Sequence, residues 1–398
     1  MTNIEYGTTM PTMIERQATK DLIRLASQYP IVTITGPRQS GKSTLARSTF
    51  KDKRYLSFED LDIREEALSD PRGFLNKYRK GVIFDEIQRV PALLSYMQTI
   101  VDEDRINGQF ILTGSQQFEL MEKVSQSLAG RTAILRLLPF SYKEIRGKYE
   151  KKTLSQILYT GMYPRIYDQN LNPTEAMSNY FSTYIERDVR QIINIKDIRL
   201  FETFLKILAG RSGQLLNTNN IATECGISHN TVKSWIAVLE ASFIIFILPP
   251  YYKNINKRLI KMPKMYFYDT GLLCYLLSIY KDNHLESHPL KGSIFETYVI
   301  SEMLKNYWNN SQPTPFYFYR DHQGNEVDLL IEEANNLQLL EIKSSQTLND
   351  SFYKGMYYLD KIYSLNTSKT LVYGGAKDDE KYKDIRVLNW ENIDKYLL

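Results

Sequence analysis

The chain has 398 residues and a formal net charge of +4, with 43% hydrophobic and 24% charged residues. This length is too great for one hydrophobic core, and the composition is that of a globular protein with about two to four domains. The longest apolar run, 243–248, is too short to cross a bilayer, and no secretory pattern opens the sequence. Cys225 and Cys274 lack metal-binding spacing and give no disulfide framework. We therefore expect a cytoplasmic protein without a membrane partner, and the modest charge does not by itself indicate nucleic acid.

A glycine-rich loop follows the apolar, β-branched run at 31–35. The loop consists of Gly36, Pro37, Arg38, Gln39, Ser40, Gly41, Lys42, Ser43 and Thr44. Residues 36–43 fit the pattern G-x-x-x-x-G-K-[ST], and 42–50 is compatible with a helix. Backbone N–H groups and a helix N-terminus in this order bind a phosphate chain, with Lys42 on the β- and γ-phosphates and the Ser43 hydroxyl on Mg²⁺. The sequence therefore predicts binding of a nucleoside triphosphate, which we take to be ATP.

Two carboxylates follow a second apolar run, 82–84. The first of them, Asp85, comes 43 residues after Lys42. We expect a buried parallel strand to deliver Asp85 to Mg²⁺ and Glu86 to an attacking water, which Glu86 would orient and deprotonate. A small-molecule kinase rarely needs the second acid, so the pair favours ATP hydrolysis.

Two later segments also fit an ATPase. Residues 109–115 read as another buried strand, and Thr113 or Ser115 at its end could contact the γ-phosphate or the water. A turn that simply uses small polar residues is the alternative. Arg131 could be a finger that enters a neighbouring subunit's ATP site. It could equally be a surface arginine or one paired within its own subunit.

Together these motifs resemble the AAA-type ATPases, and more narrowly a bacterial and archaeal family with a carboxy-terminal domain of unknown function. The resemblance covers most of the chain. It rests on residues 36–44, 84–88, 112–115 and 128–131, and it continues through 161–164, 184–188 and 269–272. It implies a five-stranded parallel sheet, a small helical lid and assembly of a homo-oligomer into a ring.

A helical region after residue 140 corresponds to the place of such a lid. Ser141 with Glu144 three residues later predicts a capped helix start, and helical periodicity continues to residue 192. Arg165 and Arg187 could sense phosphate from this lid. The alternative for each is a solvated arginine or one paired with a nearby acid.

Residues 217–239 predict two short helices with a turn at Gly226, which is the pattern of a helix-turn-helix. Lys233 would lie on the outer face of the second helix. Two strands at 241–252 and 261–269 would then form a wing. The basic residues of its tip are Lys253, Lys257, Arg258 and Lys261. We expect a winged helix that contacts DNA phosphates through these residues, with protein docking as the alternative.

The C-terminal third predicts a helix at 291–306, a strand at 316–320 and a hairpin made by 325–332 and 337–343. The helix carries Glu296, which could lie near the hairpin.

Three hairpin residues suggest chemistry. Strand alternation puts Glu341 and Lys343 on one face, and Asp328 joins them if the register allows. With Glu296 this set resembles the PD-(D/E)XK nuclease core, although Val327 replaces the usual proline. That resemblance implies a divalent ion held by carboxylates and a lysine that positions water. A hairpin with solvated acids is the alternative, and such a fold can also outlast its chemistry.

We therefore expect an α/β multidomain chain: a P-loop AAA-type parallel sheet with a helical lid, a winged helix-turn-helix and an α/β nuclease-like C-terminal domain. The expected boundaries are 1–138, 139–195, 196–283 and 284–398. The expected function is ATP hydrolysis that acts on DNA. The alternative is a nucleotide-gated switch or protein-remodelling ATPase whose C-terminal modules bind protein and cleave nothing.

Overall fold

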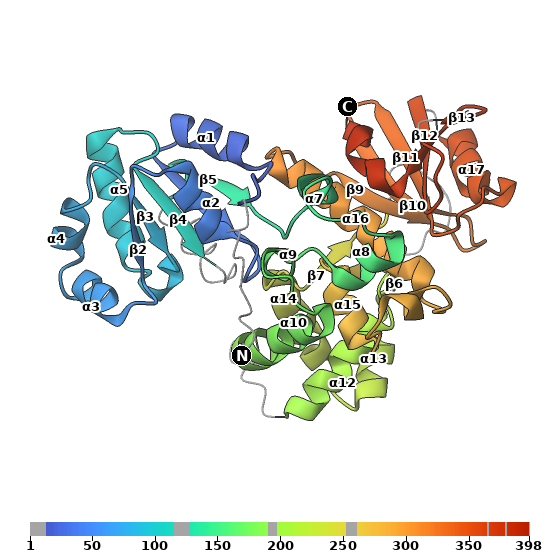
Figure 1. Ribbon diagram of the computed structural model, residues 1–398, viewed down its shortest axis with the longest axis horizontal. Helices are drawn as coiled ribbons and strands as arrows, with labels where there is room; N and C mark the ends of the chain where they lie inside the picture. Colours follow the sequence, from blue (N-terminus) through green and yellow to red (C-terminus); the bar gives the residue numbers. More distant parts are fainter. Residues whose placement is uncertain are drawn as a thin grey trace, which may run out of the picture.

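The computed structural model describes residues 13–114, 128–189, 197–251, 261–363, 366–378 and 380–397, and gives only the backbone of 186–189 and 397. Within these residues the strands form three sheets, of five, six and three strands. The five-stranded sheet and its helices make one lobe, and the other two sheets lie together on the opposite side of the molecule (Figure 1). None of the helices in the described ranges combines the length and apolar character needed to span a bilayer.

The first sheet has the order β2-β3-β4-β1-β5, and every pairing in it is parallel. Its strands are β1 Ile31–Thr35, β2 Arg54–Ser57, β3 Val82–Asp85, β4 Phe110–Gly114 and β5 Thr132–Arg136. The helices around it are α1 Thr19–Gln28, α2 Lys42–Thr49, α3 Leu61–Ser69, α4 Pro71–Asn76, η1 Ile87–Arg89 and α5 Leu93–Asp104. The five-stranded parallel sheet expected from the sequence is thus confirmed.

Alternate residues of the central strands serve opposite faces of this sheet. Val32 and Ile34 pack with α1 and α2, whereas Phe84, Phe110 and Leu112 pack with α4 and α5. Strands buried on both faces explain why these runs are continuously apolar in the sequence. The carboxyl ends of the strands, where β1 and β3 deliver their polar residues, stay at one edge.

Short helices follow the first lobe. They are α7 Tyr142–Ile145, α8 Leu154–Thr160, α9 Pro164–Asp168, α10 Pro173–Tyr180 and its π-helical continuation η2 Phe181–Val189. The predicted start at Ser141 is confirmed as a capping box: Ser141 Oγ accepts from the Glu144 backbone, and the Glu144 side chain accepts from the Ser141 backbone.

The two short helices predicted at 217–239 are confirmed, and the second extends to residue 241. Asn217 caps the first helix by accepting from the backbone of Asn219 and Asn220, and Gly226 ends it at φ +65°. The helices are α12 Ile198–Ala209, α13 Thr218–Cys225 and α14 His229–Ala241. They adjoin an antiparallel sheet of order β6-β8-β7, made of β6 Gln214–Leu215, β7 Ile245–Leu248 and β8 Lys264–Phe267.

The third sheet is mixed, with the order β13-β14-β12-β11-β10-β9. Its strands are β9 Phe316–Arg320, β10 Glu326–Glu333, β11 Asn336–Lys343, β12 Asn366–Tyr373, β13 Glu380–Tyr382 and β14 Ile385–Asn389. The remaining helices are α15 Thr270–Leu276, η3 Asp282–Leu285, α16 Lys291–Asn309, η4 Asp350–Tyr353, α17 Lys354–Ile362 and η5 Trp390–Leu397. The predicted β10–β11 hairpin is confirmed, and α16 and α17 cover opposite faces of the sheet.

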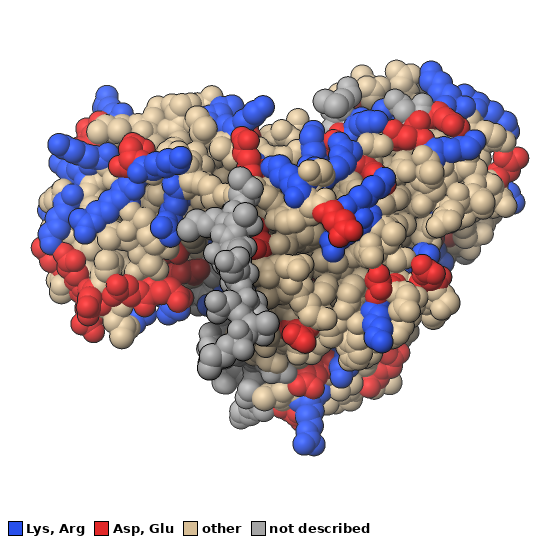
Figure 2. Space-filling model, in the orientation of Figure 1, with Lys and Arg blue, Asp and Glu red and all other residues tan. Residues whose placement is uncertain are grey.

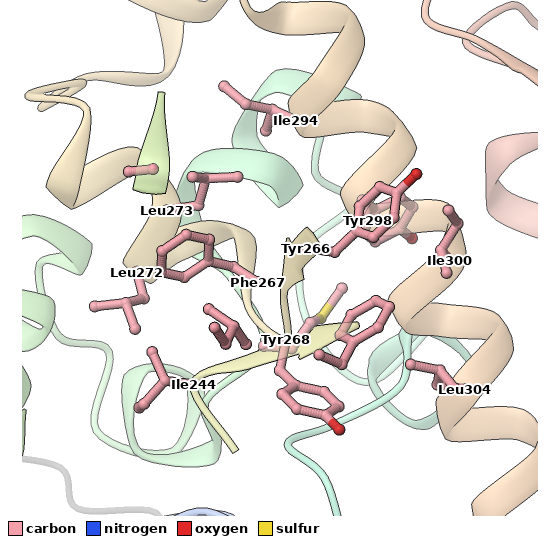
Figure 3. Close-up of a cluster of buried hydrophobic side chains, with 14 of the residues drawn as sticks. Ile244, Tyr266, Phe267, Tyr268, Leu272, Leu273, Ile294, Tyr298, Ile300 and Leu304 are labelled. Carbon is pink, nitrogen blue, oxygen red and sulfur yellow. The ribbon is translucent and has the colours of Figure 1, made fainter. Parts of the chain in front are cut away.

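One hydrophobic core runs from the short helices through the helix pair to the third sheet. Figure 3 shows its centre, where Tyr266 of β8 lies on the side of Tyr298 of α16, whereas Phe267 points the other way, toward Leu272 of α15. The core is continuous across the predicted boundaries at 195/196 and 283/284, so these segments pack as neighbours in one body. The division into four domains stays a prediction.

Candidate active site

The loop between β1 and α2 wraps around the side chain of Lys42. Gly36 and Gly41 have φ values of +151° and +92°, and a Cβ on Gly36 would stand 2.1 Å from the Leu137 carbonyl oxygen. Only glycine fits there. Lys42 Nζ donates to the carbonyls of Gly36 at 3.0 Å and Pro37 at 2.7 Å. Burial lowers the pKa of Lys42 to about 8 although nearby carboxylates oppose this shift, so the ammonium is still mostly charged at pH 7.

Asp85, at the end of β3, accepts hydrogen bonds from three neighbouring elements. Ser43 Oγ donates to its Oδ1 at 2.8 Å, Tyr55 Oη donates to its Oδ2 at 2.6 Å, and Thr113 also donates to Oδ1. Burial, together with the Asp85 contact, raises the pKa of Tyr55 to about 12, so the phenol is a donor at neutral pH. A hydroxyl and a carboxylate so close are hard oxygen ligands of the kind Mg²⁺ takes, so Ser43 and Asp85 fit that ion.

Glu86 directly follows the strand in a left-handed backbone conformation, with φ +55°. This conformation is uncommon for a residue with a side chain, and such strain is concentrated at functional sites. Gln88 donates from its side-chain amide to the Glu86 carboxylate.

A cavity of about 590 Å³ collects these groups. Its wall comprises Arg38, Gln39, Gly41, Lys42, Ser43, Thr44, Ser57, Glu59, Asp85 and Glu86 from the first lobe, and Pro164, Arg165, Asp168 and Gln169 from α9 and the residue after it. The predicted lid residue Arg165 therefore does border the cavity. A second, more apolar cavity of about 450 Å³ shares part of this wall and continues past Ile14, Leu45 and Phe140.

Arg16 joins the glycine-rich loop to the short helices. Its guanidinium donates to the Ser40 carbonyl at 2.7 Å, to the Leu138 carbonyl at 2.7 Å and to Glu144 Oε1 at 3.0 Å. Sequence reasoning missed both Arg16 and Tyr55. Neither lies in a motif, and the Arg16–Glu144 contact joins residues 128 positions apart.

Arg131 lies at the far edge of the first sheet from the glycine-rich loop. It precedes β5, whose first residue Thr132 pairs with Ile31, whereas the loop follows the other end of β1. Its guanidinium makes a two-point ion pair with Asp102 of the same chain, at 2.6 and 2.7 Å. Arg131 is not among the residues that border its own cavity. Its role stays a prediction.

Two other predicted residues fall outside what the structure describes. Ser115 lies outside the described residues, and so does the side chain of Arg187.

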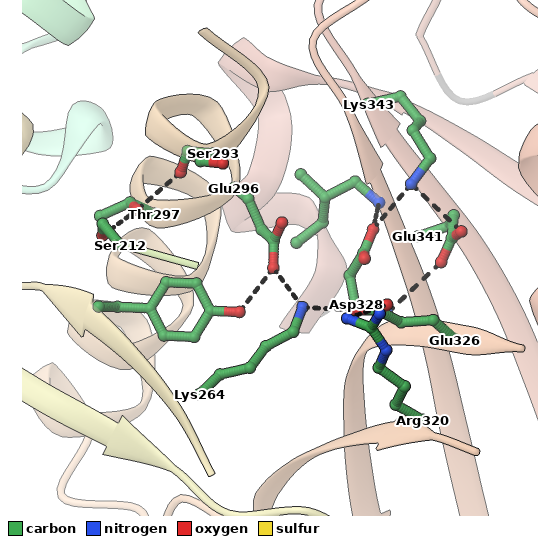
Figure 4. Close-up of polar contacts among 12 residues, drawn as sticks. Ser212, Lys264, Ser293, Glu296, Thr297, Arg320, Glu326, Asp328, Glu341 and Lys343 are labelled. Carbon is green, nitrogen blue, oxygen red and sulfur yellow. Dashed lines mark hydrogen bonds and ion pairs between the residues drawn. The ribbon is translucent and has the colours of Figure 1, made fainter. Parts of the chain in front are cut away.

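A second polar cluster lies at the end of the β10–β11 hairpin (Figure 4). Lys343 Nζ lies 3.0 Å from Asp328 Oδ2 and 3.2 Å from Glu341 Oε1, so these three predicted residues come together. The pairing register of β10 shifts between Val327 and Leu330, and such a bulge re-aims the side chain within it. Asp328 lies in that shift.

The predicted Glu296 reaches the same cluster from α16, but through residues that sequence reasoning missed. Glu296 Oε1 accepts from Lys264 Nζ at 3.0 Å and from Tyr266 Oη at 2.5 Å. The same lysine pairs with Glu326 Oε1 at 2.6 Å. No spacing in the sequence links β8 to this cluster.

The charges in this cluster oppose one another. Burial alone would raise the pKa of Asp328, but Lys343 and Lys264 outweigh it and lower that pKa. Burial, with Asp328 nearby, raises the pKa of Glu341 well above its usual value despite Lys343. Burial likewise raises the pKa of Glu296 although Lys264 opposes it.

The predicted DNA-binding residues are described only in part. Lys233 is exposed on α14, and Lys261 is exposed ahead of β8. Lys253, Lys257 and Arg258 lie outside the described residues.

Comparison with protein-family models matches residues 28–146 to an AAA domain. Residues 151–283 and 291–393 match two domains of unknown function, DUF8612 and DUF4143. The first match, the parallel sheet and the phosphate-binding loop together define residues 28–146 as an AAA-type P-loop ATPase domain. The chain joins this domain to a C-terminal domain of unknown function, as the sequence indicated.

Two curated proteins are similar in sequence over most of this chain. A Mycobacterium tuberculosis protein, described as uncharacterized, is 29% identical over 340 residues, which are 84% of this chain and 75% of that protein. An uncharacterized Haemophilus influenzae protein is 24% identical over 289 residues, 64% of this chain and 70% of that protein.

Solved structures give weaker similarities. A Walker-type ATPase of Pyrococcus abyssi has a TM-score of 0.47 at 13% identity, covering 66% of this chain and 96% of that one. AMPPCP-bound DnaA from Aquifex aeolicus has a TM-score of 0.31 at 16% identity, covering 56% and 85%. Both scores are too low to support an inference.

The hydrogen bond from Tyr55 to Asp85 predicts a specific defect. Tyr55→Phe removes the donor to Oδ2 and lets the carboxylate rotate, so the Mg²⁺ concentration needed for half-maximal ATP turnover should rise about five- to tenfold. Turnover at saturating Mg²⁺ should change much less. The measurement is a Mg²⁺ titration of steady-state hydrolysis, with Tyr96→Phe as the control because Tyr96 is an exposed tyrosine on α5 of the same lobe. An unchanged titration curve for Tyr55→Phe would contradict the positioning role.

Proposed function

We propose that the chain binds and hydrolyses ATP. The observation that carries this proposal is the convergence of Lys42, Ser43, Asp85 and Glu86 on one cavity that also borders α9. The phosphates would lie in the loop, where Lys42 would exchange the carbonyls of Gly36 and Pro37 for phosphate oxygens. The adjoining apolar cavity, with Phe140 in its wall, would take the base.

The residues divide the hydrolysis between them. Ser43 and Asp85 would hold Mg²⁺, which when bound neutralises charge on the β- and γ-phosphates. Glu86 would orient a water and accept its proton, and Arg165 would approach the phosphates from the α9 side. Arg16 fixes the loop backbone through the Ser40 carbonyl.

Two substitutions should separate binding from chemistry. Lys42→Ala should weaken ATP binding itself, because it removes the cation on the phosphates. Glu86→Gln should leave ATP bound but slow hydrolysis by about 10²- to 10⁴-fold, because only proton transfer is lost. Equilibrium binding of labelled ATP and steady-state phosphate release measure the two effects. Unchanged turnover in the Glu86→Gln protein would contradict the assignment of Glu86 as the general base.

We further propose that Arg131 acts in a neighbouring subunit of a homo-oligomer. Arg131 lies at the opposite edge of the sheet and does not border the cavity of its own subunit. It would therefore reach an ATP site only across a contact between subunits. Asp102 would hold the guanidinium until that contact forms.

Mixing experiments test this arrangement. Arg131→Ala should abolish turnover and leave ATP affinity near normal, and mixing it with Lys42→Ala protein should restore part of the activity at shared interfaces. Arg24→Ala serves as the control, because Arg24 is another surface arginine, paired with Asp21 at 2.9 Å. No recovery in mixed samples whose assembly is confirmed would argue against a role in trans.

DNA is the substrate we propose for this ATPase. The four segments would act as an ATPase domain, a lid, a winged helix and a nuclease-like tail, with the boundaries given by the sequence. The support is the helix pair α13–α14, which presents Lys233, and the basic run that includes Lys261. Figure 2 shows acidic and basic side chains interspersed over most of one face, with one group of acidic side chains over α3, where DNA would be repelled.

Replacing the basic residues should weaken DNA binding in a salt-dependent way. Substituting alanine at Lys233, Lys253, Lys257, Arg258 and Lys261 should lower the affinity for duplex DNA. Each phosphate that is no longer neutralised should flatten the log–log salt dependence by about 0.9. Fluorescence anisotropy over a salt series measures this slope, with exposed Lys20 of α1 as the control substitution. Binding indifferent to these changes would favour a protein-binding switch instead.

The alternative is a nucleotide-gated switch whose C-terminal segments bind protein. One observation favours it: the carboxylates of the tail are already paired with lysines of the chain. ATP turnover measured with and without duplex and single-stranded DNA separates the two proposals, because only the first expects stimulation by DNA.

A further inference from the structure

A buried lysine of the three-stranded sheet lies among the carboxylates of the C-terminal cluster. Lys264, in β8, has only 3% of its side chain exposed. Its Nζ lies 3.0 Å from Glu296 Oε1 and 2.6 Å from Glu326 Oε1 (Figure 4). The ring of Phe318 lies 5.5 Å from the same ammonium. A charge this deeply buried persists because carboxylates surround it.

The two lysines of the cluster engage each of its four carboxylates. Lys264 pairs with Glu296 and Glu326, and Lys343 pairs with Asp328 and Glu341. In the described part of the chain, no three His, Cys, Asp or Glu side chains are arranged to hold a metal ion.

A divalent ion that used Glu296 or Glu326 would compete with Lys264 for the same oxygens. Mg²⁺ and Mn²⁺ need carboxylate oxygens at about 2.1 Å, whereas Glu296 Oε1 already accepts from both Lys264 and Tyr266. An ion bound there would lie within a few ångströms of the ammonium, at a buried position where like charges repel strongly.

We propose that the ammonium of Lys264 takes the position of the divalent cation in this cluster. The wild-type tail then binds no metal there and cuts no phosphodiester bond while β8 stays in place. This inference rests on the proposed nuclease-like arrangement of the tail and is independent of ATP hydrolysis.

The position of Lys264 is set outside the tail. In the strand register, Lys264 is opposite Leu215 of β6 and Leu248 of β7, and both of these strands adjoin the helix pair. Its partners Glu326 and Glu296 belong to β10 and α16. The lysine is therefore an autoinhibitory contact between two sheets, and metal chemistry in the tail depends on where β8 lies.

Manganese binding tests the inference on the full chain. The parent protein carries Asp85→Asn, which removes a proposed metal ligand of the ATP site, and no nucleotide is added. Electron paramagnetic resonance counts bound Mn²⁺ in this parent and in its Asp328→Asn, Lys264→Met and Lys264→Met/Asp328→Asn derivatives. Lys369→Met is the matched control, because Lys369 is also a buried lysine of the tail, paired with Asp360 at 2.9 Å and Asp384 at 2.8 Å.

We expect no Asp328-dependent Mn²⁺ site in the parent or in the Lys369→Met control up to about 1 mM. Lys264→Met should gain one site per chain with a dissociation constant below about 1 mM, and adding Asp328→Asn should remove it.

Two results would overturn the inference. One is a site in the parent that Asp328→Asn abolishes. The other is a folded Lys264→Met protein that gains no Mn²⁺ site, or only one that persists when Asp328→Asn is added. If Lys264→Met does not fold, the double variant Lys264→Met/Glu326→Gln is measured instead, because it removes a carboxylate charge together with the lysine. The same two results would then overturn the inference. ATP turnover, read from protein with Asp85 intact, reports separately on the proposed ATPase.

Discussion

Helix α16 is the element on which the arrangement of the other segments depends. It is buried along most of its 19 residues, and several of its polar side chains pair with groups of other elements. Glu302 accepts from the Tyr142 backbone at 2.7 Å and from Lys305 at 2.7 Å. Ser301 donates to the Tyr268 carbonyl at 2.7 Å. Through these contacts α16 meets both the short helices and the three-stranded sheet.

The same helix also contacts the five-stranded ATPase sheet and the C-terminal polar cluster. Trp308 of α16 lies under the guanidinium of Arg136, which ends β5 of the ATPase sheet. Glu296, three turns earlier on the helix, reaches Lys264 and thereby the C-terminal cluster. A change in the position of α16 would disturb the ion pair of Glu296 with the buried Lys264, and leaving a buried charge unpaired is costly.

A contiguous set of polar contacts also joins the glycine-rich loop to this helix. Arg16 binds the Ser40 carbonyl on one side and Glu144 on the other. Glu144 caps α7, and the backbone of Tyr142, the first residue of α7, donates to Glu302. The backbone of the phosphate-binding loop and the centre of α16 are therefore tied to the same short helix.

The sequence predicted those parts of the protein whose structure is determined by residues close together along the chain. These parts are the phosphate-binding loop, the acid pair at the end of β3, the Ser141–Glu144 capping box and the β10–β11 hairpin. The sequence could not show contacts made by distant residues. Lys264 meets Glu296 only because β8 packs on α16, and Asp328 turns to Lys343 within a shift of strand register. Pairing of Arg131 with Asp102 has the same long-range origin.

The most direct measurement is a crystal structure of the full chain with Mg²⁺ and an ATP analogue that is not hydrolysed. We expect the phosphates in the loop between β1 and α2, Mg²⁺ against Ser43 Oγ and Asp85, and Lys42 Nζ moved from the carbonyls of Gly36 and Pro37 to phosphate oxygens. A nucleotide bound elsewhere, with Lys42 still on those carbonyls, would contradict the assignment of this cavity as an ATPase site.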